Sequence, residues 1–211
     1  MKVRVHTNDI APRSSFSITW ALIGLVLVGA ALSIHLTTDT RWMEWHLSRL
    51  GEGGHLSSAI FNYTMGIAAI IFTILAMRIS EELQTAEPHD GARVLRNLII
   101  AAAVCWVGVA CFPFDAFPVI HNVFGYGEAF ILMIAMLGLK QICPRFSNRT
   151  YYIGLTASCI MAALLGLYLT IHLTTLLFVE LVGEALLFSW LLSMTADMRR
   201  IARKPVMTVY K

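Results

Sequence analysis

Three glutamates lie deep inside long apolar stretches of this sequence. Glu180 and Glu184 are one helical turn apart, and Glu128 stands about ten residues into an earlier apolar stretch. A carboxyl group is costly to bury in an apolar helix, so it usually marks a functional site or a buried pair. Carboxyl groups in apolar surroundings can also keep a proton near neutral pH and act as general acids. We therefore predict that Glu128 and Glu184 are acid–base residues.

Histidines and other polar residues accompany these glutamates. His121 precedes Glu128 by seven residues, which places both on one face of a helix, with Asn122 beside them. We predict His121 as a third catalytic residue. The side chains predicted to bind the substrate are His46, Ser48, Arg49, Asn62, Asp115, Asn122, His172 and Glu180.

Several chemistries fit this set of residues. Histidine and carboxylate are usual ligands of catalytic zinc, but the chain has no H-E-x-x-H motif, so a zinc site would have to be assembled from different helices. Ser48 and Ser57 are conceivable nucleophiles with histidines nearby, although no G-x-S-x-G motif supports them. Acid–base chemistry without a metal is equally open, and the sequence does not decide among the three.

The composition places these residues in a membrane protein. Of the 211 residues, 57% are hydrophobic and only 14% are charged, against about 25% charged in a typical soluble domain. The mean hydropathy of +0.70 leaves too little polar surface for a soluble enzyme. The net charge of +3 does not indicate nucleic-acid binding, because the basic residues lie between apolar runs and form no patch.

Six apolar stretches are long enough to cross a bilayer as α-helices, which need about 20 residues each. They run over residues 17–36, 58–77, 98–114, 118–139, 151–171 and 173–194. We predict an all-α polytopic protein with six transmembrane helices in three hairpins. Its parts are an N-terminal segment (1–16), the transmembrane domain (17–195) and a basic tail (196–211). The acidic segment 80–90 is predicted to be a solvated connector.

Charge predicts the orientation. Fourteen of the 16 Lys and Arg residues fall in the termini and in the 78–97 and 140–150 connectors, and only Arg41 and Arg49 lie on the opposite side. The positive-inside rule then places both termini in the cytoplasm. The histidines and polar residues near 37–57 consequently face outward, where we expect a pocket covered by this loop.

These observations predict a multi-pass plasma-membrane protein that binds a lipid or amphipathic molecule in an outward-facing pocket. An extension of this hypothesis is that the protein also modifies the bound molecule chemically. Membrane lipids are the expected partners. Two alternatives stay open. The first is a proton-coupled transporter of small molecules or lipids, which we expect to be a homodimer because six helices are few for alternating access. The second is a non-catalytic scaffold subunit whose polar groups only hold helices together.

Short motifs add a resemblance to a known family. They are His46-Leu47-Ser48-Arg49-Leu50-Gly51, Phe61-Asn62, Gly66, Gly108, Phe112-Pro113 and His121. In these the chain resembles the prokaryotic multi-pass family called domain of unknown function nine-nine-eight, which is distantly similar to eukaryotic FRAG/DRAM/Sfk-type membrane proteins. The resemblance extends through the fourth predicted helix. It implies six helices, an outward polar cluster and, from the association of the eukaryotic relatives with lipid remodelling and trafficking, a lipid ligand.

Overall fold

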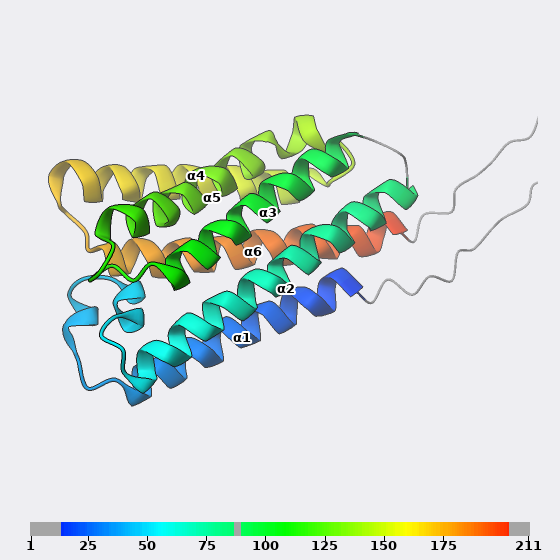
Figure 1. Cartoon of the computed structure of the whole chain (residues 1–211). Helices are drawn as coiled ribbons and strands as arrows, with labels where there is room; N and C mark the ends of the chain where they lie inside the picture. Colours follow the sequence, from blue (N-terminus) through cyan, green and yellow to red (C-terminus); the bar gives the residue numbers. More distant parts are fainter. Residues whose placement is uncertain (1–13, 87–89, 203–211) are drawn as a thin grey trace, which may run out of the picture.

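The computed structural model describes residues 14–86 and 90–202, and it is all-helical (Figure 1). Six long helices follow one another: α1 (Ser14–Leu36), α2 (Leu56–Ala86), α3 (Asp90–Cys111), α4 (Pro118–Ile142), α5 (Asn148–Gly166) and α6 (Leu176–Ala202). All six are long and apolar enough to cross a membrane. The predicted all-α fold with six spanning helices is confirmed.

Short helical turns connect some of these helices. Between α1 and α2 lie two 3-10 turns, η1 (Arg41–Met43) and η2 (Leu47–Gly51). The last turn after α5, η3 (Leu167–Ile171), is a π-helix that ends at His172 in the left-handed conformation, with φ of 51°. The greater part of the predicted N-terminal segment (1–13) and of the basic tail (203–211) lies outside the described residues.

The helices extend further than the apolar runs. The prediction of a solvated connector over 80–90 is wrong for residues 80–86, because α2 continues to Ala86, and α3 already begins at Asp90 rather than near 98. Helix α6 likewise runs to Ala202, past the predicted end of the transmembrane domain. Hydropathy locates only the part of a helix that contacts lipid, whereas backbone hydrogen bonding continues the helix into the aqueous interface.

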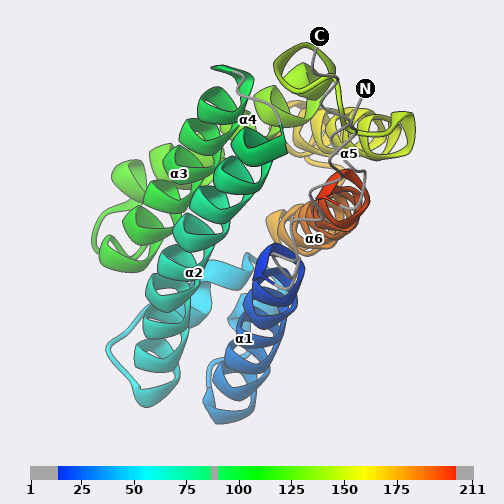
Figure 2. The ribbon, with the colours of Figure 1, turned by 90° about the vertical axis from the view of Figure 1, so that its right-hand side faces the viewer.

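The six helices form a ring in chain order, in which each contacts the next and α6 closes onto α1 (Figure 2). The beginning of α1 and the end of α6 lie at the same end of the bundle, which we call the terminal end (Figure 1). Residues 37–55 and the α3–α4 and α5–α6 connections lie at the opposite end, which we call the loop end. The outer surface is strongly apolar and includes exposed Leu27, Ile70 and Ile134, as expected for helices in lipid.

Two glycines allow adjacent helices to approach closely. A Cβ atom at Gly29 of α1 would lie 2.2 Å from the Thr64 hydroxyl of α2, and one at Gly108 of α3 would lie 2.2 Å from the Phe124 ring of α4. Any larger residue would push these pairs of helices apart. Small residues are the usual means of bringing transmembrane helices into contact.

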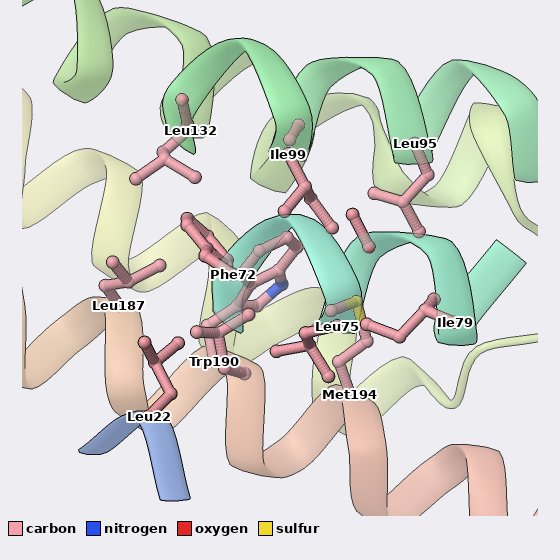
Figure 3. Packing of buried hydrophobic residues seen from close by; sticks show 14 of the residues in the cluster. Leu22, Phe72, Leu75, Ile79, Leu95, Ile99, Leu132, Leu187, Trp190 and Met194 are labelled. Atoms are coloured by element: carbon pink, nitrogen blue, oxygen red, sulfur yellow. The ribbon is translucent and has the colours of Figure 1, made fainter. Parts of the chain in front are cut away.

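A dense apolar core holds the bundle together toward the terminal end. Phe72 and Leu75 of α2 pack with Trp190 and Met194 of α6, and all four side chains are fully buried (Figure 3). Residues of α1, α3, α4 and α5 belong to the same cluster. On α6, the residues that line the cavity inside the ring fall within 176–187 and lie nearer the loop end than Trp190 and Met194.

Candidate functional site

A cavity of about 180 Å³ lies inside the ring. All six helices contribute to its wall, together with residues 46–48 of the long connection between α1 and α2. Most of the wall is apolar, with side chains such as Val26, Met65, Leu132 and Leu187. The predicted site residues that line it are His46, Ser48, His121, Asn122, Glu128, Glu180 and Glu184.

The remaining four predicted site residues lie elsewhere. Arg49 and Asp115 border a separate polar hollow at the loop end. Asn62 donates a hydrogen bond to the Gly51 carbonyl at 3.0 Å, which ties α2 to η2. His172 is exposed at the end of η3. The sequence indicated the depth of these residues but not the direction in which each side chain points.

Ser48 is the centre of a hydrogen-bonded network at the end of the cavity nearest the loop. Its Oγ lies 3.0 Å from Nε2 of His121 and 2.9 Å from Nδ1 of His46. Oε1 of Glu180 lies further away, at 3.4 Å, while Oε2 of Glu180 accepts a hydrogen bond from the backbone N–H of Leu47. These contacts join η2 to α4 and α6 across the mouth of the ring.

The backbone carbonyl of Phe112 determines the tautomer of His121. Nδ1 of His121 lies 2.8 Å from this carbonyl, which can only accept a hydrogen bond, so Nδ1 carries the proton. In the neutral ring, Nε2 then has a free lone pair directed at Ser48. The Ser48 hydroxyl is therefore the donor in its contact with Nε2 of His121, and since it has one proton, its contact with His46 then needs the His46 tautomer that carries a proton on Nδ1.

The His46 ring lies close to both the cavity and the polar hollow. Its ring lines the cavity, and its Nε2, which lacks a hydrogen-bond partner within the described residues, lies 3.7 Å from Oε1 of Glu52 in the hollow. Burial lowers the pKa of His46 to about 4, with further contributions from His121 and Arg49, so the ring is neutral at pH 7. Burial also raises the pKa of the Glu52 carboxyl.

The polar hollow measures about 470 Å³ and contains charges of both signs. The Arg49 guanidinium lies 3.6 Å from Asp39 and 3.7 Å from Glu52. Asp39 also forms a bidentate pair with Arg41, and these hydrogen bonds hold the pKa of Asp39 well below its usual range. This hollow is suited to a polar or charged group, next to a cavity with mainly apolar walls.

Two further carboxyl groups lie deeper in the cavity. Glu128 is seven residues beyond His121 on α4, and Glu184 is one turn beyond Glu180 on α6, which places them about 10 Å and 6 Å further from the loop end. Both carboxyl groups belong to residues that line the same cavity. Oε2 of Glu184 is buried and has no hydrogen-bond partner among the described residues.

A metal site finds no support in the described part of the chain, because no three His, Cys, Asp or Glu side chains there are grouped to bind an ion. The side chains that could serve as metal ligands in this network already form hydrogen bonds. His121 bonds to Phe112 and Ser48, and Glu180 bonds to Leu47. What the network can do chemically is transfer protons between a hydroxyl and a neutral imidazole.

Three contributors to this site were not predicted from the sequence. They are the Phe112 carbonyl, the Phe114 ring, which packs edge-on against both His46 and His121, and Glu52. A backbone carbonyl has no signature in a sequence. The only available hint was the Phe112-Pro113 pair before α4, since the chain turns there and brings a carbonyl back toward His121.

Comparison of the chain with protein-family models, with curated proteins and with solved structures finds no match. The resemblance to the family of domain of unknown function nine-nine-eight therefore stays a prediction based on short motifs.

Proposed function

We propose that this multi-pass membrane protein binds a lipid or another amphipathic molecule in the cavity, with the loop end facing outward from the plasma membrane. The observation that supports this proposal is the composition of the cavity wall. Apolar side chains from six helices surround the space, while Ser48, His121 and Glu180 gather at the end nearest the loop. A ligand that matches this wall has an apolar part and a polar part.

The size of the cavity favours partial insertion of the ligand. Its 180 Å³ correspond to about six water molecules at about 30 Å³ each. Pockets that enclose a whole drug-sized ligand measure about 300–1,000 Å³. The cavity therefore has room for a headgroup or a short chain segment, and the rest of the ligand would stay in the bilayer, as a membrane lipid can.

The polar hollow supports the same interpretation. The His46 ring lines the cavity, Glu52 lines the hollow, and these two side chains lie 3.7 Å apart. A ligand at the cavity mouth is thus close to both apolar surface and the charges of Arg49 and Glu52. The basic residues of the described chain support the orientation, because Arg41 and Arg49 at the loop end are outnumbered by those at the terminal end.

Lipid retention tests the proposal. The protein is purified in a mild detergent and its bound lipid is measured by native mass spectrometry. Ala129 lines the cavity on α4, so Ala129→Phe places a bulky ring in the cavity. Ala185→Phe places the same ring on the exposed surface of α6. We expect wild type and Ala185→Phe to retain lipid and Ala129→Phe to lose it. Equal retention by the two variants, or no lipid on the wild type, would contradict the proposal.

Proton-coupled transport is the second candidate, and the deep carboxyl groups of Glu128 and Glu184 favour it. Against it, the fully buried Phe72, Trp106 and Trp190 fill the bundle toward the terminal end. Transport predicts pH-dependent flux in proteoliposomes that Glu128→Gln abolishes. The scaffold alternative is less well supported, because a carboxyl group that joins helices needs hydrogen-bond partners, and Oε2 of Glu184 has none within the described chain.

A further inference from the structure

The Ser48 hydroxyl has the surroundings of an activated nucleophile. The nitrogens closest to its Oγ are Nδ1 of His46 at 2.9 Å and Nε2 of His121 at 3.0 Å, and Oε1 of Glu180 is further away at 3.4 Å. Of the two histidine nitrogens, only Nε2 of His121 is fixed as an acceptor by a second contact of its ring. Nδ1 of His121 is fixed by the Phe112 carbonyl at 2.8 Å. A nucleophile, a base and a group that orients the base are the three parts of a serine–histidine catalytic site.

The base is held in its active form. Because Nδ1–H of His121 donates to a carbonyl, Nε2 keeps the lone pair that must accept the serine proton. In serine hydrolases an aspartate usually has this orienting role and also stabilises the charged imidazolium. The Phe112 carbonyl supplies the orientation and a partial negative charge, so we expect a slower reaction than in an enzyme with a buried aspartate.

Other groups hold Ser48 in place. Nδ1 of His46 lies 2.9 Å from Oγ of Ser48, and in the tautomer with the proton on Nδ1 it donates to Oγ and leaves the hydroxyl proton to His121. Glu180 holds the backbone at Leu47, the residue before Ser48. His46 and Glu180 are therefore positioning residues. Asn122 and Tyr126 line the same cavity, and their side chains contain N–H and O–H groups of the kind that stabilises a negative charge on a substrate oxygen.

We propose that Ser48 and His121 form a nucleophile–base pair that cleaves a carboxylic ester in an amphipathic molecule bound in the cavity. This inference rests on the proposed function. Oγ of Ser48 attacks the ester carbonyl carbon while its proton passes to Nε2 of His121. The bond to the alcohol oxygen breaks, and the His121 proton passes to that oxygen, so that an alcohol leaves. Water, deprotonated by His121, then attacks the acyl-Ser48 ester, which releases a carboxylic acid and restores the hydroxyl.

The experiment uses a fluorophosphonate with an alkyl chain, which forms a stable bond to activated serines. The purified full-length protein in lipid nanodiscs is treated with this probe, and the modified peptide is identified by mass spectrometry. Hydrolysis of a p-nitrophenyl ester of a fatty acid is followed in parallel. Ser58→Ala is the matched control, because the Ser58 hydroxyl lies at the same end but donates to the His55 carbonyl at 2.7 Å.

We expect modification at Ser48 and a burst of p-nitrophenol, both lost in Ser48→Ala and unchanged in Ser58→Ala. His121→Gln should slow both reactions by about 10²–10⁴-fold, the usual contribution of a general base. Ser48→Cys keeps a nucleophile, so modification of the introduced thiol by an alkyl iodoacetamide that depends on His121 would support the pair even if Ser48→Ala unfolds. A wild type that retains lipid but is not modified at Ser48 would overturn this inference and leave the proposed function standing. A wild type that retains no lipid would overturn the proposed function first.

Discussion

Acidification from pH 7 to pH 4 is expected to destabilise the folded protein through His46. Burial lowers the pKa of His46 to about 4, whereas an exposed histidine titrates near pH 6.5. Between these values the unfolded chain binds a proton at this ring and the folded protein does not. The free energy of unfolding therefore falls as the pH falls through this window. At about 1.4 kcal/mol for each tenfold difference in proton affinity, the loss is about 3 kcal/mol at pH 4.

Thermal unfolding in detergent micelles, followed by tryptophan fluorescence at pH 7, 5.5 and 4, measures this loss. For a chain of this size, the loss corresponds to a decrease in Tm on the order of 10 °C. His46→Gln cannot titrate and should lose less stability than the wild type over the same range. The raised pKa of Glu52 acts in the opposite direction, but Glu52 is present in both proteins, so their difference isolates His46.

His35→Gln is the matched control, because His35 is a histidine at the same end of the bundle but is exposed. It should follow the wild type at every pH. If the wild type and His46→Gln lose the same stability between pH 7 and pH 4, His46 is not the group that causes the loss. The same conclusion follows if His35→Gln removes as much of the pH dependence as His46→Gln does.

Three further predictions concern the contacts that hold the bundle. Gly108→Ala should lower the free energy of unfolding by about 1–3 kcal/mol, because the Cβ atom of the alanine would lie 2.2 Å from the Phe124 ring. A second substitution, Phe124→Leu, should restore part of the lost stability, as measured by thermal unfolding. Glu180→Ala removes the acceptor of the hydrogen bond from Leu47 N–H, and a buried N–H left without a partner costs about 1–3 kcal/mol; limited proteolysis should then cut within residues 37–55 faster than in the wild type. Asp197→Ala removes the acceptor of two hydrogen bonds at the start of α5 and should lower Tm, yet bound lipid measured by mass spectrometry should not change, because α5 starts at the terminal end.

The six helices could be predicted because a bilayer leaves little choice to the backbone. Every N–H and C=O group in the apolar layer must be paired within the segment, so a long apolar run becomes a helix whatever its neighbours do. The ends of the helices were less well predicted. Residues 80–86 are mostly polar and were assigned to a connector, but they continue α2, since water does not oblige a helix to stop.

The candidate site was predicted in part. Glu128, Glu180 and Glu184 stood out because an ionisable group inside an apolar run is costly, and all three line the cavity. Asp115 and His172 were chosen with them on depth alone, and they lie outside the cavity. Position along a helix specifies depth in the membrane, whereas the direction of a side chain depends on how the helices pack around one another.

The amino-acid sequence alone was sufficient for the membrane class, the number of spans and the residue types at the site, because these follow from local costs of burial. The pairing of Ser48 with His121 was not accessible in this way. These residues are 73 positions apart, and the group that fixes the His121 tautomer is the backbone carbonyl of Phe112, which every residue type possesses. Their meeting depends on the packing of η2 against α4 and α6, and hydrogen-bond geometry between distant segments exists only once the tertiary structure has formed.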